Sequence, residues 1–151
     1  MGIATEEKAR DLVIDQLSRR GAKCVHVHRA GRRPFIVATN DDRSRTVWLS
    51  VRSRASGTWQ TSTDYGIIRR HKANETSYWI FVDLTKSHEK KFYVVPEWWI
   101  ENDIYRIHHE CIAKHGGKRK RTPDSKHHAI YEDRIRRWHD RWDLLRILER
   151  A

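Results

Sequence analysis

Ser50 and Arg52 are the two polar side chains whose type and spacing most directly suggest chemistry. They lie two residues apart in residues 46–54, where apolar residues alternate with other types. Successive side chains of a β-strand point to opposite faces, so the pair projects from one face. Arginine keeps its charge in proteins and clamps a phosphate with two parallel hydrogen bonds, whereas serine is a weak neutral ligand for a cation. The pair therefore predicts contact with a phosphate.

The element that positions this pair is predicted to be a β-hairpin. Two short apolar runs, residues 34–38 and 46–54, flank residues 39–45, which are polar and rich in turn-favouring types. Val47, Leu49 and Val51 occupy the opposite face of the second strand from Ser50 and Arg52. The hairpin would thus present its polar pair away from these apolar side chains.

This hairpin resembles the catalytic hairpin of the PD-(D/E)XK, or restriction-endonuclease-like, nuclease superfamily. Those enzymes carry an acid on the first strand, after a proline or an apolar residue, and an acid-x-Lys or Gln-x-Lys triplet on the second. Aligning Pro34-Phe35 with the approach to the acid places Ile36 at the acid position and residues 50–52, Ser-Val-Arg, at the triplet. An alkyl group, a hydroxyl and a guanidinium do not replace the groups that metal-assisted hydrolysis requires. The resemblance implies a nuclease scaffold without its catalytic site, metal or other cofactor.

The elements around the hairpin follow the order of that superfamily's αβββαβ core, with an added helix and strand. Apolar periodicity predicts the elements themselves. They are a helix over residues 5–20, strands over 23–28, 77–84 and 91–96, a helix over 96–115, and a helix over about 129–149 that rests on the stripe Ile135, Trp138, Trp142 and Leu145. We expect one α/β domain over residues 1–151. Its restriction-endonuclease-like core would be a central mixed β-sheet of about four to five strands, flanked by an N-terminal helix and C-terminal helices.

Acidic residues elsewhere leave an active nuclease open as an alternative. The superfamily tolerates relocation of its metal ligands, so six carboxylates are candidates to converge on the hairpin: Glu6, Glu7, Asp41, Asp42, Asp64 and Asp83. If they converged, the protein would be a metal-dependent DNA endonuclease that uses magnesium or manganese. We favour a helix-dipole role for Glu6 and Glu7, and an ion pair with a neighbour for Asp83.

The charge of the chain favours a polyanionic partner. Lysine and arginine outnumber aspartate and glutamate by 31 to 20, which gives a net charge of +11. Nucleic acid, and duplex DNA in particular, is the expected partner. The expected contacts are Arg52, Arg54, Arg69 and Arg70, together with a basic loop over residues 114–126 that contains Lys118, Arg119, Lys120 and Arg121. The leading interpretation is therefore a non-catalytic DNA-binding protein on a nuclease-like scaffold.

Two further expectations come from the same composition. The positive charge also suits an acidic protein, so a regulatory module that binds a partner protein is a third possible function. Two cysteines do not suggest a disulfide framework, and no apolar stretch is long enough for a bilayer, so a reducing, cytoplasmic setting without a membrane is expected. Cys24, His26 and His28 alternate on one strand face, a poor geometry for a zinc site.

Overall fold

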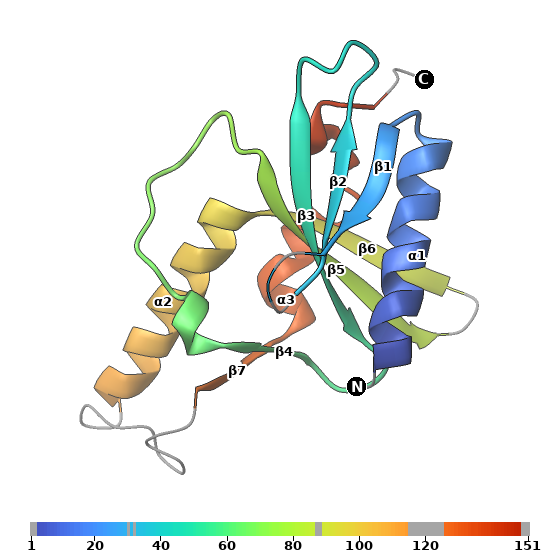
Figure 1. Ribbon diagram of the computed structural model, residues 1–151. Helices are drawn as coiled ribbons and strands as arrows, with labels where there is room; N and C mark the ends of the chain where they lie inside the picture. The colour runs from blue at the N-terminus through green and yellow to red at the C-terminus, as the bar shows by residue number, and fades with distance from the viewer. Residues whose placement is uncertain (1–2, 30, 32, 87–88, 115–125, 149–151) are drawn as a thin grey trace.

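A computed structural model describes residues 3–29, 31, 33–86, 89–114 and 126–148 of the chain (Figure 1). None of the described helices is long and apolar enough to cross a membrane. The elements are, in chain order, α1 (Ile3–Arg19), β1 (Lys23–His28), β2 (Phe35–Thr39), β3 (Thr46–Arg54), β4 (Trp59–Ser62), the 3-10 turn η1 (Thr63–Tyr65), β5 (Ser77–Lys86), β6 (Glu89–Pro96), α2 (Glu97–Lys114), β7 (His127–Ile130), α3 (Glu132–Ile135), and the 3-10 turns η2 (Arg136–Trp138) and η3 (Trp142–Leu145).

Five strands form one mixed sheet in the order β1-β2-β3-β5-β6. β3 and β5 run parallel, and the other neighbours are antiparallel. A parallel pair needs a crossover connection, which here is formed by residues 55–76 and includes β4 and η1. β4 pairs with β7 in a separate two-stranded sheet. The prediction of an α/β fold with a central mixed sheet and helices at both ends is confirmed.

Apolar side chains cover both faces of the central sheet. On one face, Val13 and Leu17 of α1 join a buried cluster with Leu49 of β3 and Ile80 of β5. On the other face, α2, β4 and β7 close a second cluster, whose buried members include Trp59, Trp79, Phe81, Tyr93, Ile100 and Ile104. Burial of this aromatic and aliphatic surface is the main force that holds the layers together.

The predicted hairpin is formed by β2 and β3. Thr39 pairs with Thr46 at the turn, and Ile36 pairs with Leu49 further along. The Asn40 side chain closes the turn, because its Oδ1 atom accepts a hydrogen bond from the Arg45 backbone N–H at 3.0 Å. This side-chain bond replaces a backbone bond in the way that turn-favouring residues commonly do. The polar insert between the two apolar runs therefore folds as expected.

The prediction of a helix over about residues 129–149 is wrong. The chain forms β7, the short α3 and two 3-10 turns in that region. Asp140 has a φ of +52° and its N–H donates to the Phe92 carbonyl at 2.9 Å, so the chain leaves the helical path beside β6. The apolar stripe is divided as a result: Ile135 and Trp138 lie in the cluster under α2, whereas Trp142 lies in the cluster under α1.

Candidate functional site

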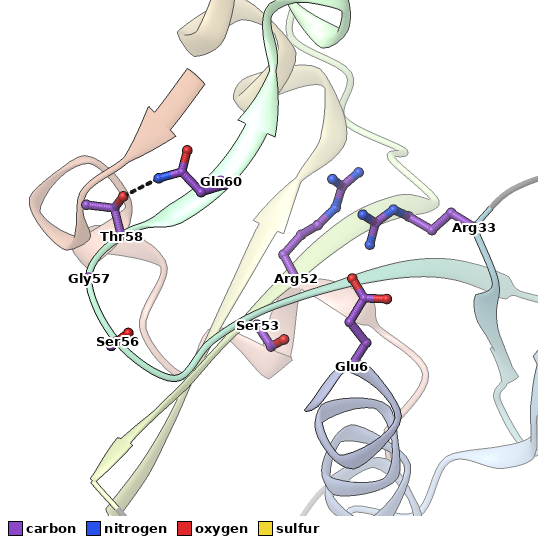
Figure 2. A pocket seen from close by; sticks show the side chains of 8 residues that line it. All are labelled: Glu6, Arg33, Arg52, Ser53, Ser56, Gly57, Thr58 and Gln60. Carbon is purple, nitrogen blue, oxygen red and sulfur yellow. Dashed lines mark hydrogen bonds between the residues drawn. The ribbon is translucent and has the colours of Figure 1, made fainter. Parts of the chain in front are cut away.

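A pocket of about 470 Å³ lies where β3 ends and the crossover to β5 begins. Its wall comes from the first turn of α1, the segment before β2, the end of β3 and the crossover itself. Figure 2 shows the lining residues, which are Glu6, Arg33, Arg52, Ser53, Ser56, Gly57, Thr58 and Gln60. The pocket thus combines two guanidinium groups with one carboxylate and several hydrogen-bonding groups.

Arg52 is held in a fixed position on this wall, with 6% of the residue exposed. Its guanidinium carbon lies 4.0 Å from the ring centre of Trp79 and 4.9 Å from that of Tyr65, and its Nε atom donates to Ser50 Oγ at 3.2 Å. Stacking on aromatic faces suits the planar guanidinium. Burial, together with the charge of Arg33, lowers the pKa of Arg52 to about 10, so the side chain remains charged at neutral pH.

Arg33 and Glu6 bring opposite charges to the same space. Arg33 precedes Pro34 at the entrance to β2, and its Nη1 atom donates to the Val51 carbonyl at 3.2 Å. Glu6 lies in the first turn of α1, and in Figure 2 its carboxylate is directed toward the two guanidinium groups. One carboxylate between two arginines leaves the pocket with excess positive charge, which is the requirement for binding an anion such as a phosphate.

Ile36 does not join Ser50 and Arg52. Ile36 and Leu49 are cross-strand partners, and both are buried in the cluster on the α1 face of the sheet. Ser50 and Arg52 follow the alternation of β3 onto the opposite face. By the same register, Phe35 is the residue of β2 that lies beside Ser50. The expected alignment of Ile36 with the acid position therefore does not bring the three positions together.

Glu6 is the one candidate carboxylate, of the six named from the sequence, that lines the pocket. In the part of the chain that the structure describes, no group of three His, Cys, Asp or Glu side chains is arranged to hold a metal ion. The other five carboxylates lie elsewhere. Glu7 is exposed on α1, and Asp42 accepts a hydrogen bond from the Ser44 N–H. The remaining three lie beside basic side chains: Asp41 is 3.7 Å from Lys23 Nζ, Asp64 is 3.3 Å from Lys126 Nζ, and Asp83 pairs with Arg54.

Arg54 and Asp83 form a nearly buried ion pair next to the pocket. Arg54 Nη2 donates to Asp83 Oδ2 at 2.8 Å, with 13% and 10% of the two side chains exposed. Arg54 also donates to the Gly57 carbonyl at 2.7 Å and lies over the Trp59 ring. Burial raises the pKa of Asp83, but hydrogen bonds from Arg54 and Thr85 outweigh it and hold the pKa below its usual value. The expected ion pair of Asp83 is confirmed, and Arg54 anchors the pocket's crossover wall.

Arg69 and Arg70 lie outside the pocket, on the crossover segment next to α2. The Arg69 side chain pairs with Glu101 at 3.2 Å, and its backbone exchanges two hydrogen bonds with the Asn102 side chain. Glu101 belongs to a glutamate cluster with Glu75 and Glu97. Burial, followed by the charges of the cluster, raises the pKa of Glu101 to about 7, although Arg69 opposes this effect.

Sequence reasoning missed part of this site and placed part of it elsewhere. Arg33 and Gln60 were not expected at the pocket; the signal for Arg33 is its position immediately before Pro34 and the first hairpin strand. Lys118, Arg119, Lys120 and Arg121 lie outside the described residues. The structure therefore concentrates the candidate site at Arg33 and Arg52.

Comparison of the chain with family models, with curated proteins and with solved structures found no match.

Proposed function

We propose that this chain binds duplex DNA through its phosphate backbone and that the pocket at the end of β3 holds a phosphate group. The single observation that carries the proposal is the convergence of Arg33 and Arg52 on a pocket that, among the described residues, is lined by hydroxyl groups and by one carboxylate, Glu6. An arginine that is stacked and hydrogen-bonded before its ligand arrives loses little side-chain entropy on binding. Such a preformed cation suits a phosphate better than a flexible lysine would.

The arrangement of the elements supports a nuclease-like scaffold for this function. α1 is followed by three antiparallel strands and by β5, which runs parallel to β3, and this order agrees with the αβββαβ core of the PD-(D/E)XK superfamily. The agreement is incomplete, because residues 55–76 contain β4 and η1 where that core has a helix. With Ile36 on the far face and Glu6 as the carboxylate at the pocket, we propose DNA binding without the metal-ligand set of that superfamily.

The electrostatics of the chain support a polyanion as the partner. A net charge of +11 raises the local concentration of DNA around the whole molecule, whereas Arg33 and Arg52 provide a defined contact. Contacts with phosphates carry little sequence information and release counterions from DNA. We therefore propose an interaction that depends strongly on salt and only weakly on base sequence.

Fluorescence anisotropy of labelled duplex DNA across a series of salt concentrations tests this function. Each phosphate contact that is removed is expected to reduce the slope of log K against log salt by about one unit. Arg33→Gln and Arg52→Gln should each lower the slope, and Arg33→Gln remains informative if the buried Arg52 is needed for folding. Arg19→Gln is the matched control, because Arg19 is exposed at the far end of α1 and its loss changes the net charge equally. Absence of DNA binding at low salt would refute the proposal.

A cleavage assay on the same protein preparation distinguishes DNA binding from DNA cleavage. Supercoiled and linear DNA are incubated with magnesium or manganese, with and without a chelator. We expect a shift in mobility without cleavage. Chelator-sensitive cleavage that disappears in Glu6→Gln would instead support the active nuclease, because Glu6 is the carboxylate at the pocket.

A further inference from the structure

Among the described residues, Trp48 stays exposed on the sheet face that carries Arg52. α2, β4 and β7 pack on this face over β5 and β6, where Trp79, Phe81 and Tyr93 are buried. Over β1, β2 and β3 the same face carries an aromatic strip, which we define as His28, Phe35 and Trp48. The strip thus lies on the same face of the sheet as Arg52, with the buried Ser50 between Trp48 and the pocket.

Trp48 is the large apolar ring of the strip, with 40% of the residue accessible. Val47 and Leu49 on either side of it are fully buried, so the backbone at Trp48 is fixed by the core. The ring centroids of His28 and Phe35 lie 5.8 Å and 6.5 Å from that of Trp48, and both rings stand nearly perpendicular to the indole. Edge-to-face contacts of this kind orient an aromatic ring. A large apolar ring is thus exposed in a defined orientation.

The strip is aligned with the cationic pocket. Trp48, Ser50 and Arg52 project from the same face of β3, and four residues of a strand span about 13 Å. One strand of stacked nucleic acid advances about 3.4 Å per nucleotide, so a few nucleotides reach from the indole to the guanidinium. A ring that can stack with a base, followed by cations that can hold a phosphate, is the combination used to bind single strands.

We infer that the aromatic strip stacks an unpaired base of a DNA strand whose phosphate lies at Arg33 and Arg52. This inference rests on the function proposed above and specifies its substrate: a duplex that continues into a single-stranded end. Bases inside a duplex are already stacked on their neighbours, and extruding one costs a few kcal/mol. An unpaired base, in contrast, has a free ring face on which Trp48 can stack.

Anisotropy with three DNA probes tests the inference: a blunt duplex, the same duplex with a short single-stranded overhang, and the overhang strand alone. Stacking of one base on an aromatic side chain corresponds to about a 5- to 150-fold gain in affinity. We expect the overhang duplex to bind more tightly than the blunt duplex, and Trp48→Ala to remove that gain without changing the salt slope. Trp48→Tyr should retain most of the gain.

Tyr131→Ala serves as the control, because Tyr131 is 59% exposed and lies just after β7, in the separate two-stranded sheet. It should leave the affinity for all three probes unchanged. Equal affinity for blunt and overhang duplexes overturns the inference, and so does an equal loss for both duplexes in Trp48→Ala. If the blunt duplex still binds with a steep salt slope in those cases, the proposed function stands while the inference falls. Absence of binding to any probe at low salt removes both.

Discussion

The ion pair between Arg54 and Asp83 provides the sharpest test of how the pocket is built. We predict that Asp83→Asn destabilises the fold by about 2–3 kcal/mol, because it removes a charge-assisted hydrogen bond from a nearly buried arginine. The carboxylate accepts from Thr85 on Oδ1 at 2.9 Å and from Arg54 on Oδ2 at 2.8 Å, whereas an asparagine places an NH2 donor where one of these two oxygens lies. The expected loss of stability is smaller than that caused by a buried charge without any hydrogen-bond partner, since Arg54 keeps the Gly57 carbonyl as a partner.

Urea denaturation followed by circular dichroism measures this loss. For a chain of this size, about 2–3 kcal/mol corresponds to a fall in Tm of about 4–12 °C. Asp143→Asn is the matched control: Asp143 also accepts from an arginine, Arg141, at 3.0 Å, but both side chains are exposed. We expect it to cost less than about 1 kcal/mol. An equal effect of the two variants would refute the idea that burial makes the Asp83 pair important.

The pH dependence of the stability difference between wild type and Asp83→Asn provides a second test. The pKa of Asp83 is lowered in the folded protein, so its contribution to stability is present above the usual carboxyl pKa and is lost as the pH falls through the folded value. The difference in unfolding free energy between wild type and Asp83→Asn should therefore be constant near neutral pH and shrink below about pH 4. A difference that grows on acidification would contradict this account.

Two further substitutions test the charges around the pocket and the glutamate cluster. Glu101→Gln should stabilise the protein at pH 8, because a neutral side chain avoids the cost of a buried carboxylate and its repulsion by Glu97 and Glu75; loss of the ion pair with Arg69 reduces but does not reverse the gain. Since the pKa of Glu101 is raised to about 7, the cost of its ionised form grows as the pH rises from the usual carboxyl pKa and is complete above about pH 7, so the gain in thermal melts should fade toward pH 5. Glu6→Gln should tighten DNA binding about two- to fivefold in anisotropy titrations, since it removes a negative charge beside Arg52. The control is Glu7→Gln, which changes the net charge equally from an exposed position and should have a smaller effect. Weaker DNA binding by Glu6→Gln would mean that Glu6 orders the arginines.

Local patterns predicted the elements that bury one continuous face. The alternation of β3 and the turn-favouring residues before it produced the hairpin, because side-chain period and turn chemistry act within a few residues. The prediction of a C-terminal helix was wrong because that segment does not bury one continuous face. Its stripe meets two separate cores, one on each side of the sheet, so the spacing from Ile135 to Leu145 does not describe one helix face.

Register explains why the site was predicted only in part. A shift of one residue in the pairing of β2 with β3 moves every side chain of a strand to the other face. The polar insert does not reveal where the first cross-strand pair forms, and the pairing of Thr39 with Thr46 sends Ile36 into the core. Arg33 reaches the pocket from outside any periodic run, so its position before Pro34 and the first hairpin strand is the signal that connects it with the site.

The same register that removes Ile36 from the site connects the pocket with the aromatic strip. Because Phe35 lies beside Ser50, one face of β3 leads from the exposed Trp48 past Phe35 and the buried Ser50 to Arg52, which lines the pocket. A pocket alone would suit any small anion, whereas a stacking surface in line with it suits an anion that carries bases. The binding proposal thus depends on the two features as one surface, and a double variant of Trp48 and Arg33 should show coupled rather than additive losses for overhang DNA.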